Sequence, residues 1–414
     1  MADGPDTSDT SPRRNSAFWT VWASFTASNL GDGFSFVAMP LVAISITDDA
    51  RLVAAVAAAQ YLPFLIIGLP AGVLIDRLDR RRIAMAAQAV RALVAGSVAA
   101  GLAADGISIG WLALAAFVLG SSEVLTDGGL PALVRDVVPP DGLEVANARL
   151  IASQRVSNQF VGPPLGALLF TIDPSLPFMA AAASAVVAAA TLARLGGSFR
   201  AEQSDEVVPI VRRTLVGLRY VLGHDVLRPL VIAVGVFSFV GSSLNATYVV
   251  LITERFGLEE TAFGLLLSVD ALSSVAMSLF VARFIARTSH SISMRFSIVC
   301  FCIASFMVGL STTAVVAFIA VVINGLADPA WNVVSGTVRQ RLVPDEVFGR
   351  MMTAYLFIAW GLRPVGALVG GVVAENWGPQ WVPLLGGVIV GSMFVLARPM
   401  FRRIDAAMAE PAGS

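Results

Sequence analysis

Five carboxylates lie inside long apolar stretches of this 414-residue chain: Asp32, Glu123, Asp127, Asp270 and Asp328. An ionised side chain is costly to keep in apolar surroundings, and carboxylates found there commonly carry function. A partly dehydrated carboxylate can take up a proton on one side of a barrier and release it on the other, and it can also pair with a cation. These residue types therefore indicate proton exchange or cation binding.

Asp32 is the first candidate for the proton-exchanging group, and Glu123 is the second. Asp32 lies near the middle of its apolar stretch between Gly31 and Gly33, where the backbone can bend and a small molecule can approach closely. The alternative is structural, with the Asp32 carboxylate only shaping a kinked helix.

Glu123 and Asp127 are four residues apart, so they share one face of a helix. Two acids this close are not expected to be ionised together, and one of them is expected to hold a proton. Asp127 has an equally good structural interpretation as the partner of Arg91 or of an arginine in a nearby loop. Asp328, close in sequence to Asn324, has the same two interpretations.

Two arginines also lie in apolar stretches. Arg91 is near the end of its stretch, where a long side chain can reach the interface or pair, so we interpret it as structural. Arg363 is near the middle and requires an acidic partner or an anionic ligand; Asp32 and Asp270 are both candidates. The amides in these stretches complete the candidate set of polar groups: Asn29, Asn245 and Asn324.

Composition places these groups in a membrane protein. The chain is 56% hydrophobic and 14% charged, with a mean hydropathy of +0.77, which is too apolar for a soluble protein of this length. All 28 basic residues are arginine, which favours a GC-rich, bacterial coding sequence. A nucleotide-binding P-loop needs a lysine, so ATP is not the expected energy source. We expect no metal or other cofactor, no nucleic-acid partner and no enzyme activity.

Twelve apolar runs approach the ~20 residues that a spanning helix needs. Arginine is concentrated in the even-numbered connections and both tails, whereas Arg51 and Arg255 are the only arginines in the odd-numbered connections. Because arginine marks the side that is not translocated, the pattern predicts a multi-pass protein of the bacterial cytoplasmic membrane with both termini in the cytoplasm. The runs are 17–46, 52–75, 83–104, 109–134, 147–171, 176–195, 228–252, 261–285, 292–311, 314–338, 351–374 and 380–400.

The chain divides into two similar halves. VGPPLGALL at 161–169 reappears as GLRPVGALV at 361–369, at an offset of 200 residues. Six-plus-six repeats are typical of secondary transporters with a site between the halves. The predicted organisation is a disordered cytoplasmic tail (1–16), an N-terminal six-helix half (17–195), a cytoplasmic linker with a basic amphipathic helix on the inner leaflet (196–227), a C-terminal six-helix half (228–403) and a cytoplasmic tail (404–414).

Two motifs resemble those of the major facilitator superfamily. GVLIDRLDRR at 72–81 resembles the G-x-L-x-D-R-x-G-R-K loop between helices 2 and 3, and GPPLGA at 162–167 resembles the G-P-x-x-G-G stretch of helix 5 in its antiporter branch. The resemblance covers 17–403 and extends to bacterial drug, macrolide and siderophore exporters. It implies an all-α fold of twelve transmembrane helices in two pseudo-symmetric halves. The motif residues are Gly72, Asp76, Arg77, Arg80 and Arg81 in the loop, and Gly162, Pro163, Pro164 and Gly166 in helix 5.

The resemblance further implies that Asp76 and its neighbouring arginines latch the two halves together on the cytoplasmic side. The chain departs from the pattern at Asp79, which replaces the second glycine of the loop, and in helix 4, where GSSEVLTDGG lacks the arginine of the family. The second departure puts the usual proton relay of the family in doubt.

The expected function is proton-coupled export of a small lipophilic compound, such as an antibiotic, by a monomer working through alternating access. Five acids against two arginines favour a neutral or cationic substrate. The alternatives are a dedicated exporter of a siderophore or lipid-like metabolite and, from another class, a transporter-like membrane scaffold or sensor.

Overall fold

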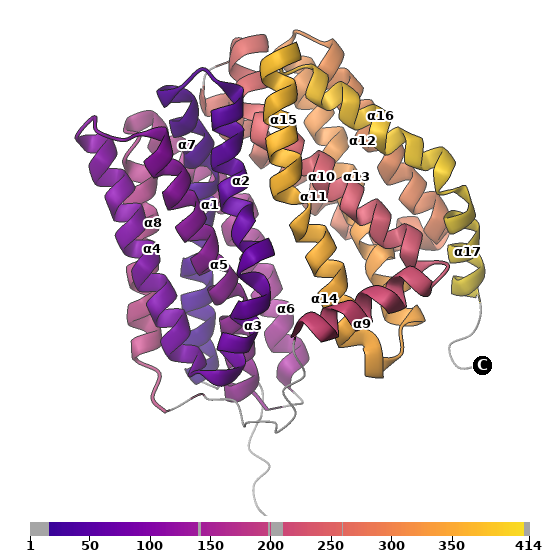
Figure 1. The fold of residues 1–414 in the computed structure, drawn as a ribbon, viewed down its shortest axis with the longest axis horizontal. Coiled ribbons are helices and arrows are strands. Elements are labelled where there is room, and N and C mark those ends of the chain that lie inside the picture. The colour runs from indigo at the N-terminus through magenta and orange to yellow at the C-terminus, as the bar shows by residue number, and fades with distance from the viewer. Residues whose placement is uncertain (1–15, 140–141, 198, 200–209, 259, 410–414) are drawn as a thin grey trace, which may run out of the picture. The chain divides into compact units, whose positions relative to one another are not determined.

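The structure is built from helices, as Figure 1 shows. This computed structural model describes residues 16–139, 142–197, 199, 210–258 and 260–409, and it contains no strand within those ranges. The predicted all-α class is confirmed. The predicted N-terminal tail, apart from its last residue, and part of the predicted linker lie outside the described residues.

The helices follow the predicted apolar runs. Among the described residues, nine helices are long and apolar enough to cross a membrane, and one further pair of helices, which meet at 55°, meets the same criteria when taken together. The two remaining runs, 52–75 and 147–171, each fall on shorter consecutive helices, because proline and glycine interrupt them. This arrangement is compatible with twelve spans.

Contacts divide the chain into two compact units. Unit 1 comprises 1–38, 66–107 and 118–205; unit 2 comprises 39–65, 108–117 and 206–414. The end of the first helix therefore packs with the C-terminal part of the sequence, and so does the second apolar run from residue 52 to Leu65. The division into six-helix halves at 17–195 and 228–403 stays a prediction.

Unit 1 is organised around the packing of α4 on α8. Its core contains Phe18, Phe25, Leu133 and Leu192, which are all buried. Its helices are α1 (Ser16–Ile46, through residue 38), α3 (Gly68–Arg77), α4 (Arg80–Ala103), α5 (Ile109–Val137, from residue 118), α6 (Leu143–Gln154), the π-helix η2 (Arg155–Val161), α7 (Gly162–Ile172) and α8 (Leu176–Ala193).

Unit 2 is organised around α10, which packs on α15 and α16, and α13, which packs on α11 and α12. Its main core includes Leu230, Trp331, Val334 and Phe401. Its helices are α2 (Ala50–Ile66, through residue 65), α9 (Ile210–Gly223), α10 (Leu227–Val250), the π-helix η3 (Leu251–Arg255), α11 (Glu260–Arg287), α12 (His290–Leu310), α13 (Ala314–Leu342), α14 (Asp345–Gly361), α15 (Arg363–Trp377), α16 (Trp381–Leu396) and α17 (Arg398–Ala409), together with the end of α1 and the start of α5.

The predicted amphipathic helix forms as α9 and packs on α14. A Cβ at Gly217 would overlap the backbone of Arg350, so only glycine allows this approach. Val221 is fully buried in a small cluster that includes Met351, whereas Leu215 and Leu222 are exposed. One apolar face is thus covered by protein, and placement of the other on the inner leaflet stays a prediction.

Candidate functional site

Asp32 of α1 forms an ion pair with Arg91 of α4 inside unit 1. The two side chains are only 13% and 7% exposed. Arg91 also donates to the Ser28 hydroxyl over 2.8 Å, and Gln88 donates to the same hydroxyl over 2.7 Å. The predicted structural pairing of Arg91 is present, but its carboxylate partner in the ion pair is Asp32 rather than Asp127.

The glycines beside Asp32 bring α1 close to other helices. A Cβ at Gly33 would lie 2.8 Å from Gly162 Cα, and one at Gly31 would lie 3.3 Å from the Ala181 carbonyl oxygen. In this structure the two glycines contact α7 and α8, and the close approach of a small molecule to Asp32 stays a prediction. They let α1 pack closely against both helices on either side of Asp32.

Glu123 and Asp127 of α5 complete an acidic cluster in unit 1. Both carboxylates interact electrostatically with Arg91, and Glu123 also acts on Asp127. Arg91 is paired with Asp32, and the two carboxylates of α5 lie close enough to feel its charge. If all are ionised, the cluster carries an excess of negative charge that a proton or a cationic group can neutralise.

The amides predicted for the site are placed differently from one another. Asn29 is 1% exposed and donates to the Phe25 carbonyl oxygen over 2.9 Å within its own helix. Asn245 accepts a hydrogen bond from Tyr61 over 3.5 Å. Asn29 is three residues before Asp32 on α1, so the two share one side of that helix.

A second buried acid lies in unit 2, where Asn324 of α13 donates to the Asp270 carboxylate of α11 over 3.0 Å. Tyr248 of α10 is close enough to interact electrostatically with Asp270. Asp328 is exposed, and its backbone carbonyl accepts from the Asn332 side chain over 3.1 Å. The structure thus brings together Asp270 and Asn324.

Arg363 is the first residue of α15, and its described contacts are aromatic. Its guanidinium carbon lies 4.0 Å from the centre of the Trp360 ring and 5.5 Å from that of Tyr61. No carboxylate pairs with it among the residues that the structure describes. Asp270, the candidate partner in the same unit, binds Asn324 instead, and a pairing of Arg363 with Asp32 stays a prediction.

The arginine loop fastens α4 to other helices of unit 1. Arg80 binds Asp136 of α5 over 2.6 Å, and Arg81 donates to the Leu192 and Ala193 carbonyl oxygens at the end of α8. Arg77 is exposed in the last turn of α3. Two further motif residues, Gly72 and the side chain of Asp76, lie outside the described part of the chain, so a latch between halves stays a prediction.

Asp79 has a clear local role. Its carboxylate accepts from the Arg82 amide over 3.1 Å and from the Phe199 amide over 3.1 Å. The first contact caps the N-terminus of α4. An aspartate therefore replaces the usual loop glycine where a helix begins.

The helix-5 motif marks a break in the helix. A π-helical turn ends at Val161 and α7 begins at Gly162, with Pro163 and Pro164 in its first turn. Gly162 contacts Gly33, and a Cβ at Gly166 would lie 3.1 Å from Phe34 Cα. The motif lets α7 cross α1 closely, with Asp32 next to the crossing.

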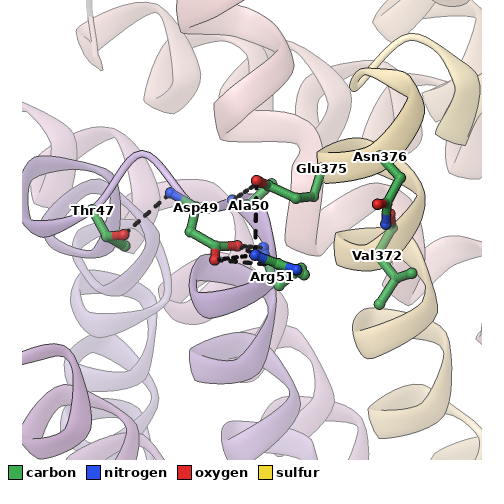
Figure 2. A network of polar contacts seen from close by, with 7 residues as sticks. All are labelled: Thr47, Asp49, Ala50, Arg51, Val372, Glu375 and Asn376. Atoms are coloured by element: carbon green, nitrogen blue, oxygen red, sulfur yellow. Dashed lines mark hydrogen bonds and ion pairs between the residues drawn. The ribbon is translucent and has the colours of Figure 1, made fainter.

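Sequence reasoning missed a polar contact that joins α2 to α15 (Figure 2). Glu375 accepts from the Ala50 amide, the first of α2, over 2.9 Å, and Arg51 lies 4.0 Å from the same carboxylate. Asp49 accepts from the Arg51 amide over 2.8 Å and binds its guanidinium. The sequence signal was weak, because Glu375 and Asp49 are ordinary acids in predicted loops.

Replacing Glu375 by Ala is expected to speed hydrogen exchange at the Ala50 amide by several-fold to about tenfold, because that amide loses its acceptor. Glu375→Gln keeps an acceptor oxygen and should keep most of the protection. Asn376→Ala is the matched control, since the Asn376 side chain donates within α15 to Val372 (Figure 2). Equal exchange in Glu375→Ala and Asn376→Ala would contradict the contact.

Asp49 lies in the turn before α2, and its bond to Arg51 holds its pKa down at about 2, against 3.8 ordinarily. Because the pKa is lower in the folded chain, the stabilisation from this pair is complete above about pH 4 and is lost as pH falls toward 2. Asp49→Asn should therefore leave the pH profile of transport unchanged between roughly pH 5 and 8. A shifted profile in vesicle assays would show that Asp49 titrates in that range.

Long apolar helices that bury an acid–arginine pair and an acid–amide pair define a multi-pass membrane protein with the architecture of a transporter. A family model described as transmembrane secretion effector matches residues 7–412, and the chain belongs to this family of the major facilitator superfamily. The predicted superfamily is confirmed. The chain is a membrane transporter of this family and not an enzyme.

Relatives and solved structures agree with this assignment. The chain is 24% identical to the multidrug efflux pump Tap of Mycolicibacterium fortuitum, over 96% of this chain and 99% of that protein. It is 22% identical to macrolide efflux protein A of Streptococcus pyogenes, over 94% and 96%. It shares its fold with a bacterial homologue of the iron transporter ferroportin in the inward-facing state, with a TM-score of 0.72, 15% identity, and coverage of 94% and 98%. The nucleoside transporter NupG has a TM-score of 0.70, 13% identity, and coverage of 96% and 100%.

Proposed function

We propose that the chain exports a small, lipophilic, neutral or cationic compound in exchange for protons, by alternating access. The observation that carries the proposal is the acidic cluster of Asp32, Glu123 and Asp127 around Arg91. The names of its relatives, a multidrug efflux pump and a macrolide efflux protein, support export of a drug-like molecule.

The cluster supports exchange because a proton and a cationic substrate would neutralise the same excess charge. Binding both at once gains less free energy than the sum of the two separate binding events, so each ligand weakens the binding of the other. A proton on Asp32 also weakens the ion pair between Asp32 and Arg91. The Arg91 guanidinium is then expected to interact more strongly with Glu123 and Asp127. Proton uptake would in this way alter the contact between α1 and α4.

The transporter works, in this proposal, as a monomer in the bacterial cytoplasmic membrane with both termini on the cytoplasmic side. The arginine-rich even-numbered connections support that orientation. Gly72, Asp76, Arg77, Arg80 and Arg81 form its cytoplasmic gate, and the helix-5 motif supports the coupling step by holding α7 against Asp32 of α1.

Drug accumulation in an efflux-deficient bacterial host tests this function. Cells expressing the chain should accumulate less of at least one compound from a panel of antibiotics and dyes, and an uncoupler should abolish the difference. Cells carrying the empty expression vector serve as the inactive control. Reduced accumulation that persists with the uncoupler would contradict proton coupling, and no effect on any compound would favour the dedicated siderophore or metabolite exporter.

A further inference from the structure

Four residues of unit 2 form an aromatic–arginine cluster: Tyr61, Phe64, Trp360 and Arg363. Phe64 and Trp360 are stacked, with ring centres 4.4 Å apart and planes inclined by 15°. The Arg363 guanidinium lies over the Trp360 ring at 4.0 Å and over the Tyr61 ring at 5.5 Å. The cluster combines flat apolar faces with one permanent positive charge.

A helix break places the charge there. α14 ends at Gly361 and α15 begins at Arg363, with Pro364 next, inside one long apolar segment from Arg350 to Trp377. The corresponding break in the N-terminal half of the sequence lies at Gly162, 200 positions before Leu362, the residue between α14 and α15. Paired interruptions in corresponding segments of a transporter point to its binding site.

The guanidinium has donors to spare. It carries five N–H groups in one plane, and stacking on an aromatic ring uses its face rather than these N–H groups. No hydrogen bond or ion pair to the Arg363 side chain occurs within the described residues, and the side chain is half-buried. A charge in an apolar segment with aromatic contacts alone favours a ligand that brings its own acceptor.

Tyr61 is held in place by its neighbours. Its ring is buried, and its hydroxyl donates to Asn245 of α10 over 3.5 Å. Two helices therefore fix one side of the cluster, and the broken helix fixes the other. Side chains held on helices in this way can discriminate between ligands of similar size.

We propose that the aromatic–arginine cluster is a substrate subsite for a flat, conjugated ring that bears an anionic oxygen group such as a carboxylate. The oxygens bind the N–H groups of Arg363, and the ring packs against the aromatic side chains. The inference rests on the proposed export function and refines its substrate class.

Two dyes that differ only at the carboxylate test the subsite: a rhodamine with a free carboxylate and its methyl ester. Their binding to the purified full-length chain in detergent is followed by fluorescence anisotropy, which requires no transport. The free acid should bind the unmodified chain roughly tenfold or more tighter than the ester, because it alone makes charge-assisted bonds to Arg363.

Variants separate the two parts of the site. Arg363→Gln should weaken binding of the free acid roughly tenfold to hundredfold and leave the ester nearly unchanged. Trp360→Leu should weaken both dyes, since it removes the ring that Phe64 and the Arg363 guanidinium both contact. Arg402→Gln, on the exposed face of α17, is the matched control and should bind both dyes normally.

Equal affinities for the two dyes, an equal loss of both in Arg363→Gln, or no binding of either dye would each overturn the subsite. Size-exclusion profiles and melting curves identify a variant that is misfolded, and Arg363→Lys, which keeps the charge but not the planar fork, then replaces Arg363→Gln. Uncoupler-sensitive efflux with no preference for the free acid would overturn the subsite alone. A clear preference without uncoupler-sensitive efflux would support the subsite and contradict the proposed proton exchange.

Discussion

Asp32→Asn is expected to reduce proton-coupled transport by roughly a hundredfold or more, because the amide cannot carry the proton. The measurement is substrate-dependent proton flux in proteoliposomes under an imposed pH gradient. Asp105→Asn is the matched control, since Asp105 is exposed in the turn after α4 and has φ of 50°, a conformation that asparagine adopts readily.

The ion pair with Arg91 makes stability a second readout for this substitution. Removing one partner of a buried pair leaves the other charge uncompensated and can cost about 3–5 kcal/mol. The cost should be smaller here, because Ser28 still accepts from Arg91 and two carboxylates of α5 act on it. The double variant Asp32→Asn/Arg91→Gln should recover stability without recovering proton flux.

These readouts separate a coupling role for Asp32 from a structural one. If Asp32 only shapes α1, the double variant should regain both stability and proton flux. Normal coupled transport in the folded single variant would remove Asp32 from the mechanism. Glu123 would then become the next candidate, to be tested as Glu123→Gln with Glu144→Gln, on the exposed face of α6, as its control.

The sequence could identify the charged residues of the acidic cluster but not their pairing. Spacing along one helix relates Glu123 to Asp127, and apolar surroundings draw attention to Asp32 and Arg91. Which acid meets Arg91 depends on how α1, α4 and α5 are rotated against one another, and no local pattern encodes that rotation. The Ser28 hydroxyl accepts hydrogen bonds from both Arg91 and Gln88. Neither Ser28 nor Gln88 had a sequence signal, because uncharged polar residues are common in apolar helices.

The surroundings of Arg363 were hidden for a different reason. Its depth in the apolar run predicted an acidic partner or an anionic ligand, with Asp32 and Asp270 as candidates. The neighbours are aromatic rings, and in a chain with 24 Phe, 7 Trp and 4 Tyr an aromatic residue within an apolar run is unremarkable. Tyr61 is also about 300 positions away in sequence, so only the packing of α2 with α15 brings it to Arg363.

The internal repeat was visible in the sequence, and the structure supplies its physical reason. Gly166 and Gly366, 200 positions apart, each lie where one helix crosses another closely. A Cβ at Gly166 would lie 3.1 Å from Phe34 Cα on α1, and one at Gly366 would lie 2.9 Å from the Phe239 carbonyl carbon on α10. Small residues permit such crossings in membrane proteins, so the repeat is a packing motif in each half of the sequence.

Gly366→Ala is expected to destabilise the protein by about 1–3 kcal/mol, because a methyl group would overlap the α10 backbone and force α15 outward. The shift would also strain the 2.6 Å hydrogen bond from the Ser243 hydroxyl to the Gly366 carbonyl oxygen. Gly166→Ala should cost less, since its neighbours need to move only slightly. The measurement is the apparent melting temperature of each purified variant in the same detergent.

Gly241→Ala is the matched control for this series. Gly241 lies on α10 close to the same crossing, but a Cβ there would meet nothing within 4 Å. Its substitution should be neutral or slightly stabilising, because alanine favours a helix more than glycine does. The expected order of melting temperatures is therefore Gly241→Ala highest, Gly166→Ala next and Gly366→Ala lowest. If Gly366→Ala melted together with Gly241→Ala, the crossing of α10 and α15 would be looser than the structure has it, and the position of Arg363, three residues before Gly366, would be in question with it.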